Sequence, residues 1–232
     1  MAETYTIAGE SVEMPVEIRS ATTWVASFAV SAEVAQRMID YSGFGVATTL
    51  PGRAMVNLAV VRYADGDLGP YHELGVTVMV DPPDPGPGVS KIGAFIHQLP
   101  VNQSFTLAAG REIWGFPKWM ARIDLADGGR RTVCKLYDDE AFVLSLSIAR
   151  GVPMPARNSA VDAYSWLDGV RRRTKWQLHA AGARGRPGGA RLELGDHPMA
   201  KELHEIGLPR RALFAGSVAR VRMTFGPPEV LR

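Results

Sequence analysis

The stretch GREIWGFPKWMARIDL, residues 110–125, joins the two features on which the interpretation of this sequence depends. From Lys118 onward, apolar residues alternate with more polar residues, which is typical of a half-buried β-strand. The turn signals Asp127-Gly128-Gly129 and Asp138-Asp139-Glu140 follow, and each leads into another strand-like segment. The sequence therefore predicts a three-stranded antiparallel meander with a lysine at its entrance.

Similar patterns continue on both sides of the meander. Helices are expected after a cap at Ser31 and after a cap at Asp196, and residues 104–112 are expected to form a short helical or turn segment. Further strands are expected at residues 22–31, 54–63, 71–81, 91–99, 173–180, 191–194 and 213–225. Many short strands, few helices and no regular βαβ alternation favour an α+β, mostly antiparallel class. We predict a single barrel-like domain that spans residues 1–232.

The composition excludes several classes of protein. The chain has 232 residues, 46% of them hydrophobic, and a formal net charge of +2, so nothing calls for nucleic acid or an anionic membrane as a partner. One cysteine rules out an intrachain disulfide framework. The N-terminus lacks the features of a signal peptide, and no apolar run approaches the ~20 residues of a membrane span. We expect a soluble, cytoplasmic protein.

Two basic stretches and a few potential metal ligands carry no functional prediction. The run Arg171–Arg173 and the Gly/Arg segment 182–189 lack interleaved aromatic residues, so we interpret them as a solvated face and a solvated loop. His197 and His204 are not in an HExxH arrangement, and Cys134 has no partner cysteine. We therefore expect neither a metal nor another cofactor.

The lysine at the start of the meander has unusual neighbours. Lys118 is surrounded in the sequence by Trp114, Phe116, Pro117 and Trp119. A lysine in water has a pKa of about 10.4, so roughly one amine in 10³ is uncharged at pH 7, and apolar surroundings favour the uncharged form. Such an amine is a nucleophile. The alternative is an ordinary surface lysine whose stem lies over an indole ring.

A glutamate stands at the start of the strand expected over residues 71–81. The alternation of this strand leaves Glu73 on one face beside small or flexible residues, namely Gly75, Thr77 and Met79, and places the apolar residues Leu74, Val76, Val78 and Val80 on the other face. Small residues beside a carboxylate leave room for a ligand. Without further information, a solvent-facing glutamate at the start of a strand is the better explanation of the pattern.

Three short motifs in this order, Leu68-Gly69-Pro70-Tyr71-His72-Glu73, Gly110-Arg111-Glu112 and Pro117-Lys118, resemble the acetoacetate decarboxylase family. The resemblance implies a closed β-rich, cone-like fold around an internal cavity and a homo-oligomer. It also implies that Lys118 forms a Schiff base with a keto acid and that Glu73 lies beside it. We interpret Arg111 and Glu112 as a structural ion pair near the cavity.

The sequence departs from the family pattern at three places. A second lysine follows the catalytic lysine in the decarboxylase, and here Trp119 occupies that position. The family's other active-site carboxylate falls near Leu58, and its substrate-binding arginine falls near Thr22. Arg19 is the nearest arginine that could take over this last role. Imine formation is thus implied, whereas binding of a substrate carboxylate is left open.

The resulting hypothesis is an acetoacetate decarboxylase-like lyase that acts on a keto acid through Lys118. Glu73 would move protons or orient the substrate. The substrate site would be lined by Tyr71, Trp114, Phe116, Trp119 and Arg19. The alternatives are a Schiff-base aldolase or dehydratase acting on a keto acid or ketone, and a non-catalytic small-molecule binder in which Lys118 only pairs with Glu73.

Overall fold

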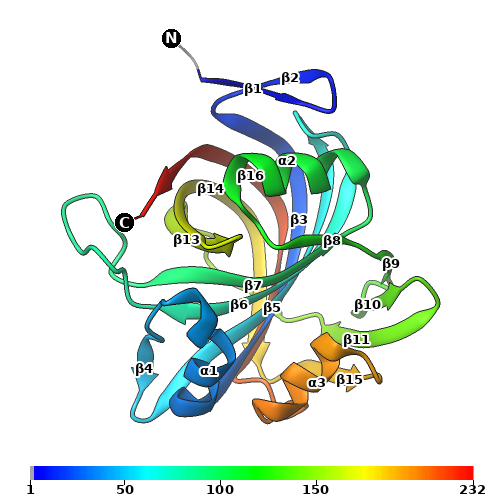
Figure 1. The fold of residues 1–232 in the computed structure, drawn as a ribbon. Helices are drawn as coiled ribbons and strands as arrows, with labels where there is room; N and C mark the ends of the chain where they lie inside the picture. The colour runs from blue at the N-terminus through cyan, green and yellow to red at the C-terminus, as the bar shows by residue number, and fades with distance from the viewer. Residues whose placement is uncertain (1–2, 232) are drawn as a thin grey trace.

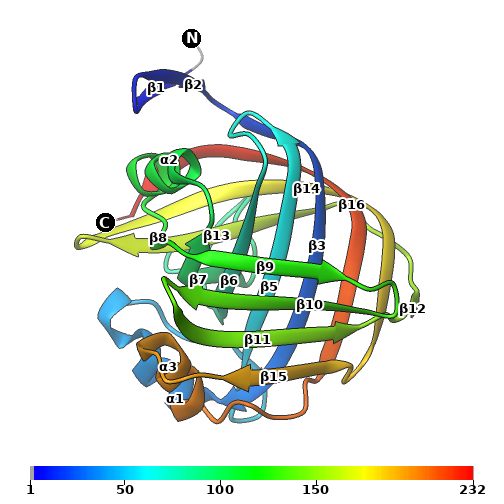
Figure 2. The same ribbon diagram turned by 90° about the vertical axis from the view of Figure 1, so that its right-hand side faces the viewer.

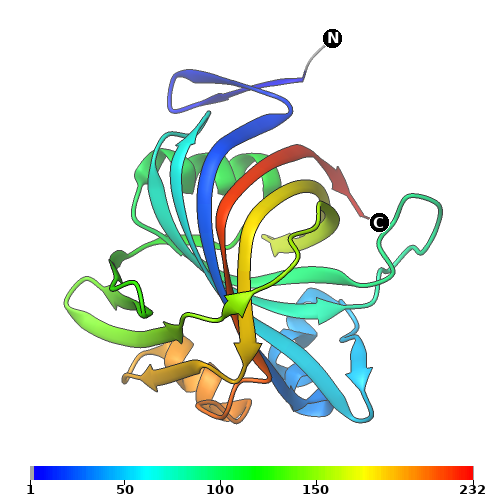
Figure 3. The same ribbon diagram turned by 180° about the vertical axis from the view of Figure 1, so that it is seen from behind.

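The computed structural model describes residues 3–231, and a closed ring of seven strands forms its centre (Figures 1 and 2). Neighbouring strands are antiparallel except for one parallel pair, β7 with β13. In ring order the strands are β3 (Val16–Ser31), β5 (Arg53–Gly66), β6 (Tyr71–Val80), β7 (Gly93–Val101), β13 (Ser159–Leu167), β14 (Val170–Pro187) and β16 (Phe214–Val230). Figure 3 shows β14 and β16 side by side where the ring closes. The predicted barrel-like α+β fold is confirmed.

Shorter strands extend the barrel. β4 (Thr48–Leu50) pairs with β5, β12 (Val152–Pro153) pairs with β14, and β8 (Lys118–Met120) pairs in parallel with β7. An N-terminal hairpin, β1 (Thr4–Ile7) and β2 (Glu10–Glu13), stands apart from the ring as a sheet of its own.

A second, four-stranded sheet packs against the outside of the barrel (Figure 2). Its order is β15 (Ala190–Leu194), β11 (Ala141–Ala149), β10 (Arg131–Asp138) and β9 (Arg122–Asp127), and every pair is antiparallel. The predicted meander is therefore present, with β15 added at its edge. Its entrance differs from the prediction, because the alternation that begins at Lys118 belongs to two strands. β8 joins the barrel and β9 joins the second sheet, with Ala121 between them.

Three α-helices complete the fold: α1 (Ala32–Ile39), which a 3-10 turn, η1 (Asp40–Ser42), extends, α2 (Ser104–Trp114) and α3 (Pro198–Glu205). The N-cap of α3 is His197 rather than the predicted Asp196, and its Nδ1 accepts a hydrogen bond from the Met199 amide. The Asp196 carboxylate pairs with Lys201 instead. Within residues 3–231, no helix is long and apolar enough to cross a membrane.

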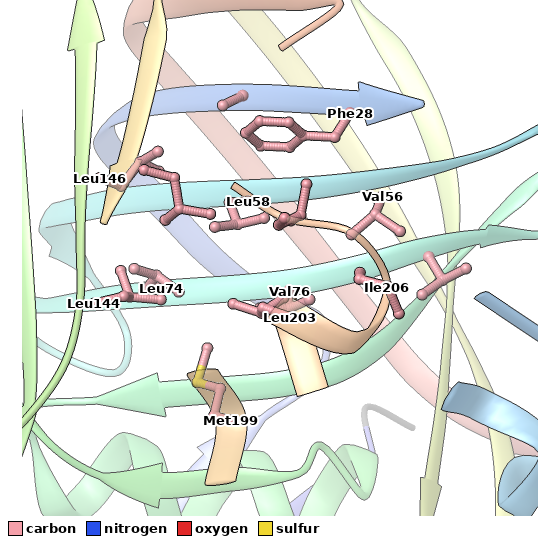
Figure 4. Close-up of a cluster of buried hydrophobic side chains, with 14 of the residues drawn as sticks. Phe28, Val56, Leu58, Leu74, Val76, Leu144, Leu146, Met199, Leu203 and Ile206 are labelled. Atoms are coloured by element: carbon pink, nitrogen blue, oxygen red, sulfur yellow. The ribbon is translucent and has the colours of Figure 1, made fainter. Parts of the chain in front are cut away.

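The outward face of the barrel wall is covered by an apolar core. On β6 the residues Leu74, Val76, Val78 and Val80 are fully buried, as their alternation predicts. They pack with Leu144 and other residues of the second sheet and with α3, and Figure 4 shows part of this outer core. Burial of this face leaves Glu73, Gly75, Thr77 and Met79 pointing into the barrel.

The inward face forms a second apolar core at the end of the barrel that α2 covers (Figure 1). The buried residues of α2 recur with helical spacing: Thr106, Ala109, Gly110, Ile113 and Trp114. They meet inward-facing residues of the barrel strands, among them Tyr63, Tyr71, Leu99 and Val101. Helix α2 therefore closes one end of the barrel over the strands that carry Glu73 and Lys118.

The Gly/Arg segment 182–189 is not the predicted loop. Strand β14 continues to Pro187 and pairs with β16 from Arg172 to that residue, and only Gly188 and Gly189 turn the chain, both with positive φ. Gly185 is buried because the ring of Phe214 and the sulfur of Met154 occupy the space that a side chain would need. Strand β13, which precedes β14, was not expected either.

Candidate active site

The Lys118 side chain is buried inside the barrel. Strand β8 pairs with the end of β7, with Lys118 opposite Leu99, and only 3% of the lysine side chain is exposed. Its Nζ lies 3.0 Å from Glu73 Oε2 and donates a hydrogen bond of 2.9 Å to Thr106 Oγ1. The ring of Tyr71 lies beneath the ammonium, 5.1 Å away at its centroid. The two residues that the family resemblance brings together are thus in direct contact.

Helix α2 shapes the channel that the lysine stem occupies. A Cβ at Gly110 would lie 2.5 Å from Cδ and 2.6 Å from Cε of Lys118, so only glycine leaves room for the stem. Thr106 stands one helical turn before Gly110, which places its hydroxyl beside Nζ. The helix therefore supplies both the space and a hydrogen-bond acceptor.

Arg111 has a different partner from the predicted one. Its Nη1 donates to the carbonyl oxygen of Lys118 at 3.1 Å, whereas Glu112 is exposed. Adjacent residues on a helix do not face each other, so an ion pair between the two is unfavourable. Arg111 has a structural role, as expected, but its partner is the backbone of β8 and not Glu112.

A tyrosine that the sequence reasoning missed holds the glutamate. Tyr63 Oη donates a hydrogen bond of 2.9 Å to Glu73 Oε1, and the Glu73 residue is 7% exposed. The β5–β6 register places Tyr63 opposite Tyr71, and their rings stack with centroids 4.1 Å apart. Each carboxylate oxygen of Glu73 thus has its own partner, Tyr63 on one side and Lys118 on the other.

The two tyrosines remain neutral over the physiological range. Burial raises the pKa of Tyr63 well above its usual value, and the negative charge of Glu73 raises it further. The pKa of Tyr71 is also well above its usual value, first through burial and then through Glu73. Both hydroxyls therefore keep their protons and are available as donors. The cluster consists of one cation, one anion and three neutral hydroxyl groups.

Two of the predicted aromatic residues lie in the same inner core as Lys118, but they contact each other and not the amine. Trp114 and Phe116 are buried and stack with centroids 5.6 Å apart. Trp114 Nε1 donates to the carbonyl oxygen of Gly226, and Ser165 Oγ donates to the carbonyl oxygen of Trp114. These bonds fasten the end of α2 to the neighbouring strands. Both residues contribute to the apolar surroundings of the Lys118 cluster.

The other two predicted binding residues lie outside this cluster. Trp119 follows Lys118 on β8, so its side chain points to the opposite face, where Nε1 donates to Gln98 Oε1 and the indole stacks on His197. Arg19 is exposed and pairs with Asp65 and Asp67. The structure therefore places neither residue beside the amine.

The structure also shows what stands at the other two positions where the sequence departs from the family pattern, near Leu58 and Thr22. Leu58 belongs to the outer core, and the hydroxyl of Thr22 donates to the carbonyl oxygen of Ala219. The inward-facing residues next to them are Thr23 and Ala59. Both are uncharged, so these positions supply neither a second carboxylate nor an arginine to the barrel interior.

Three residues of the cluster escaped the sequence reasoning: Tyr63, Thr106 and Gly110. A signal for each is present in the sequence. Tyr63 ends the strand expected over residues 54–63 and Tyr71 begins the next expected strand, and an antiparallel connection places such residues opposite each other. Thr106 and Gly110 lie on the apolar stripe of an amphipathic helix, where a hydroxyl and a missing side chain both stand out. Within residues 3–231, no group of three or more histidine, cysteine, aspartate or glutamate residues could hold a metal ion.

Comparisons with known proteins agree with this architecture. The sequence model of the family described as acetoacetate decarboxylase (ADC) matches residues 4–232. No curated protein sequence matches the chain.

Several solved structures share the fold. An acetoacetate decarboxylase has a TM-score of 0.72 at 16% identity, over 94% of this chain and 89% of the other. The acetoacetate decarboxylase of Legionella pneumophila has a TM-score of 0.72 at 20% identity, over 94% and 87%. The enduracididine biosynthesis enzyme MppR, complexed with the condensation product of pyruvate and imidazole 4-carboxaldehyde, has a TM-score of 0.69 at 13% identity, over 99% and 97%.

Proposed function

The chain belongs to the acetoacetate decarboxylase family, and on that premise we propose that it is a Schiff-base-forming lyase with Lys118 as its nucleophile. The observation that carries the proposal is the contact of 3.0 Å between Lys118 Nζ and Glu73 Oε2 inside the barrel. Removal of two charges from water costs several kcal/mol per ion before their attraction is counted. A buried pair of this kind is therefore weak support for a purely structural role and points to chemistry.

The proposed reaction begins when Glu73, in contact with Nζ, takes a proton from the Lys118 ammonium, and the neutral amine attacks a ketone carbon. Glu73 gives this proton to the carbonyl oxygen. It then takes a second proton from the nitrogen and passes it to the resulting hydroxyl, which leaves as water. The product is an iminium between Nζ and the former carbonyl carbon. The hydroxyl of Thr106, 2.9 Å from Nζ, can keep the nitrogen directed towards the carbonyl.

The iminium then accepts the electron pair of an adjacent bond. If that bond joins the α-carbon to a carboxylate, carbon dioxide leaves; if it is a C–H bond, Glu73 removes the proton. Either path gives an enamine, which takes a proton or attacks a second carbonyl, and water finally releases the product from Lys118. Tyr63, which donates to Glu73 Oε1, keeps the carboxylate oriented through these transfers.

An aldolase or dehydratase is the second candidate, and two observations favour it. Trp119 and Arg19 both lie away from the amine, so neither replaces a cationic group of the decarboxylase. The similar MppR structure contains a condensation product of pyruvate, which is what an enamine and an aldehyde form. Both candidates share the imine at Lys118 and differ only in the bond that breaks.

Borohydride trapping tests the shared step. The protein is incubated with acetoacetate, pyruvate or a longer keto acid, reduced, digested and mapped by mass spectrometry. We expect a reduced adduct on Lys118, none on the K118R variant, and an unchanged pattern for K135R, which alters an exposed lysine on β10. If none of the carbonyl compounds forms an adduct on Lys118, the result would favour a non-catalytic binder. Release of carbon dioxide from acetoacetate then separates the decarboxylase from the aldolase.

Membership of the family also suggests the partner, the location and the oligomeric state of the enzyme. We propose a small-molecule keto acid or ketone as its partner, no dependence on nucleic acid or membrane, a cytoplasmic location and a homo-oligomeric state. Light scattering on the purified full chain measures the subunit number directly.

A further inference from the structure

The inner wall of the barrel beyond Glu73 consists of two rows of side chains on β3, β5 and β6. The first row is small: Gly75 pairs with Ala59, and Ala59 pairs with Val25. The second row is polar: Thr77 pairs with Asn57, and Asn57 pairs with Ser27. The register between these strands has no bulge in this region, so all six side chains share the inward face with Glu73.

The interior is hollow at these two rows. The outward-facing residues that alternate with them are almost completely buried, for example Leu58 and Val76, neither of which is exposed. In contrast, every inward-facing residue of the two rows except Gly75 is partly exposed: Val25, Ser27, Asn57, Ala59 and Thr77. Because the outside of the wall is covered, solvent reaches these side chains from inside the barrel. The hollow thus begins at the row next to Glu73 and extends away from α2.

The polar row is well placed to contact the far end of a substrate bound at Lys118. Thr77 follows Glu73 by four residues on β6, which corresponds to about 13 Å along a strand. Leu99 covers Gly75, since its Cδ1 lies 3.3 Å from the place a Cβ would take, whereas Ala59 beside it is partly exposed and has only a methyl group, so the path along the wall passes over Ala59. A ligand held at Nζ by its carbonyl carbon can therefore run along the wall to Asn57.

The amide of Asn57 is held in place but keeps its donors for a ligand. Ser27 Oγ donates to Asn57 Oδ1 at 2.7 Å, which fixes the amide plane. Asn57 Nδ2 has only weak acceptors, Thr77 Oγ1 at a long 3.4 Å and the thioether Met79 Sδ at 3.5 Å. The described inward-facing residues of β3, β5 and β6 that border the hollow carry no charge beyond Glu73. Transfer of a carboxylate into such surroundings is costly without a cation.

We infer that Ser27, Asn57 and Thr77 determine substrate specificity, and that the substrate is a ketone or aldehyde whose far end is neutral and forms hydrogen bonds, such as an alcohol, an amide or a second carbonyl. This inference rests on the proposed imine at Lys118. It concerns the end of the substrate away from the reacting carbonyl, so it holds for a decarboxylase and for an aldolase alike.

A matched series of methyl ketones tests the inference on the wild-type protein. The compounds have equal chain length and end in a carboxamide, a hydroxyl, a methyl or a carboxylate, and each is trapped on Lys118 with borohydride over a range of concentrations. We expect the carboxamide and hydroxyl compounds to need the lowest concentration for half-maximal trapping, and the carboxylate the highest. Equal or better trapping of the carboxylate overturns the inference and leaves the proposed function standing. No adduct with any compound overturns both.

Two variants locate the effect. N57L is expected to raise the half-saturating concentration of the carboxamide compound by roughly three- to tenfold, the loss of about one hydrogen bond. The methyl-ended compound should still be trapped, at an equal or lower concentration, because leucine offers it an apolar contact, and this shows that the barrel is intact. The control N158L changes an exposed asparagine in the same way and should alter neither value. If N57L affects all compounds equally, Asn57 is not a specificity residue.

Discussion

Lys118 and Glu73 meet inside the barrel although their strands do not pair with each other. Strand β7 lies between them: Leu99 on β7 is opposite Lys118, and Val101 is opposite Glu73. Nζ and Oε2 are 3.0 Å apart in a place where the lysine side chain is 3% exposed and the glutamate side chain 9%. The contact therefore depends on the register of three strands, and each charge offsets part of the cost of burying the other.

This mutual dependence predicts how the protein responds when one charge is removed. K118M leaves Glu73 buried without its cation, and we expect a loss of about 3–5 kcal/mol in the free energy of unfolding. The double variant K118M/E73Q removes both charges and keeps an acceptor for Tyr63, so most of the stability should return. Urea denaturation of the two single variants and the double variant measures the coupling. Additive losses would contradict a paired interaction.

Gly110 gives a prediction in which two physical effects oppose each other. Alanine in a helix interior is normally more stable than glycine by about 1 kcal/mol. At Gly110, however, the new Cβ would lie 2.5 Å from Cδ of Lys118, so the lysine has to move. We expect G110A to abolish trapping at Lys118 and to destabilise the protein by about 1–3 kcal/mol.

The matched control for this variant is G45A. Nothing lies within 4 Å of a Cβ at Gly45, and its φ is not positive. This variant should therefore trap ketones like the wild type. If G110A retained full trapping, the lysine stem would not need the space that α2 leaves for it.

Part of this site could be predicted from the sequence, and the missing parts have physical reasons. The alternation on β6 assigned Glu73 to the face opposite Leu74 because burial of one face of a strand leaves a clear period of two. The period of two also applies to β8, where it places Trp119 and Lys118 on opposite faces of the strand. The prediction that Trp119 lines the lysine pocket did not take this alternation into account. Proximity along the chain is a poor guide to proximity in a strand.

Other features depend on partners that are distant in the sequence. Strand β14 runs through a glycine-rich segment because β16 pairs with it to close the barrel. This pairing cannot be predicted from the strand propensity of the segment itself. Thr106 and Gly110 became functional candidates only when α2 was placed over β8. The fold class followed from the strand pattern, whereas the contacts of the lysine required tertiary packing.

Trp119 is expected to position β8 rather than to bind substrate. Its Nε1 donates to Gln98 Oε1 at 3.1 Å, and Gln98 Nε2 in turn donates to Glu202 Oε2 on α3 at 3.3 Å. W119F removes the first bond and keeps an aromatic ring. We expect slower trapping on Lys118 with an unchanged half-saturating ketone concentration, because the lysine backbone is less well fixed. A raised half-saturating concentration with an unchanged rate would instead assign Trp119 to the substrate site. W166F, on the same outer side of the barrel, is the control.

The junction between α3 and the barrel should weaken in acid. Glu202 Oε2 lies 3.0 Å from His97 Nε2, and His97 is 5% exposed. The hydrogen bond with His97 is the largest cause that lowers the pKa of Glu202 below its usual 4.5, and burial opposes it. A carboxyl group with a lowered pKa in the folded state stabilises the protein above its unfolded pKa, and this contribution is lost as the pH falls through the folded value. Wild-type protein should therefore be more stable than E202Q at neutral pH, and the difference should shrink below about pH 4.5.

Urea denaturation of both proteins across this pH range measures the difference, with E205Q on the exposed side of α3 as the control. A difference that stays constant down to the most acidic pH would show that the Glu202 carboxylate does not stabilise the junction through its charge.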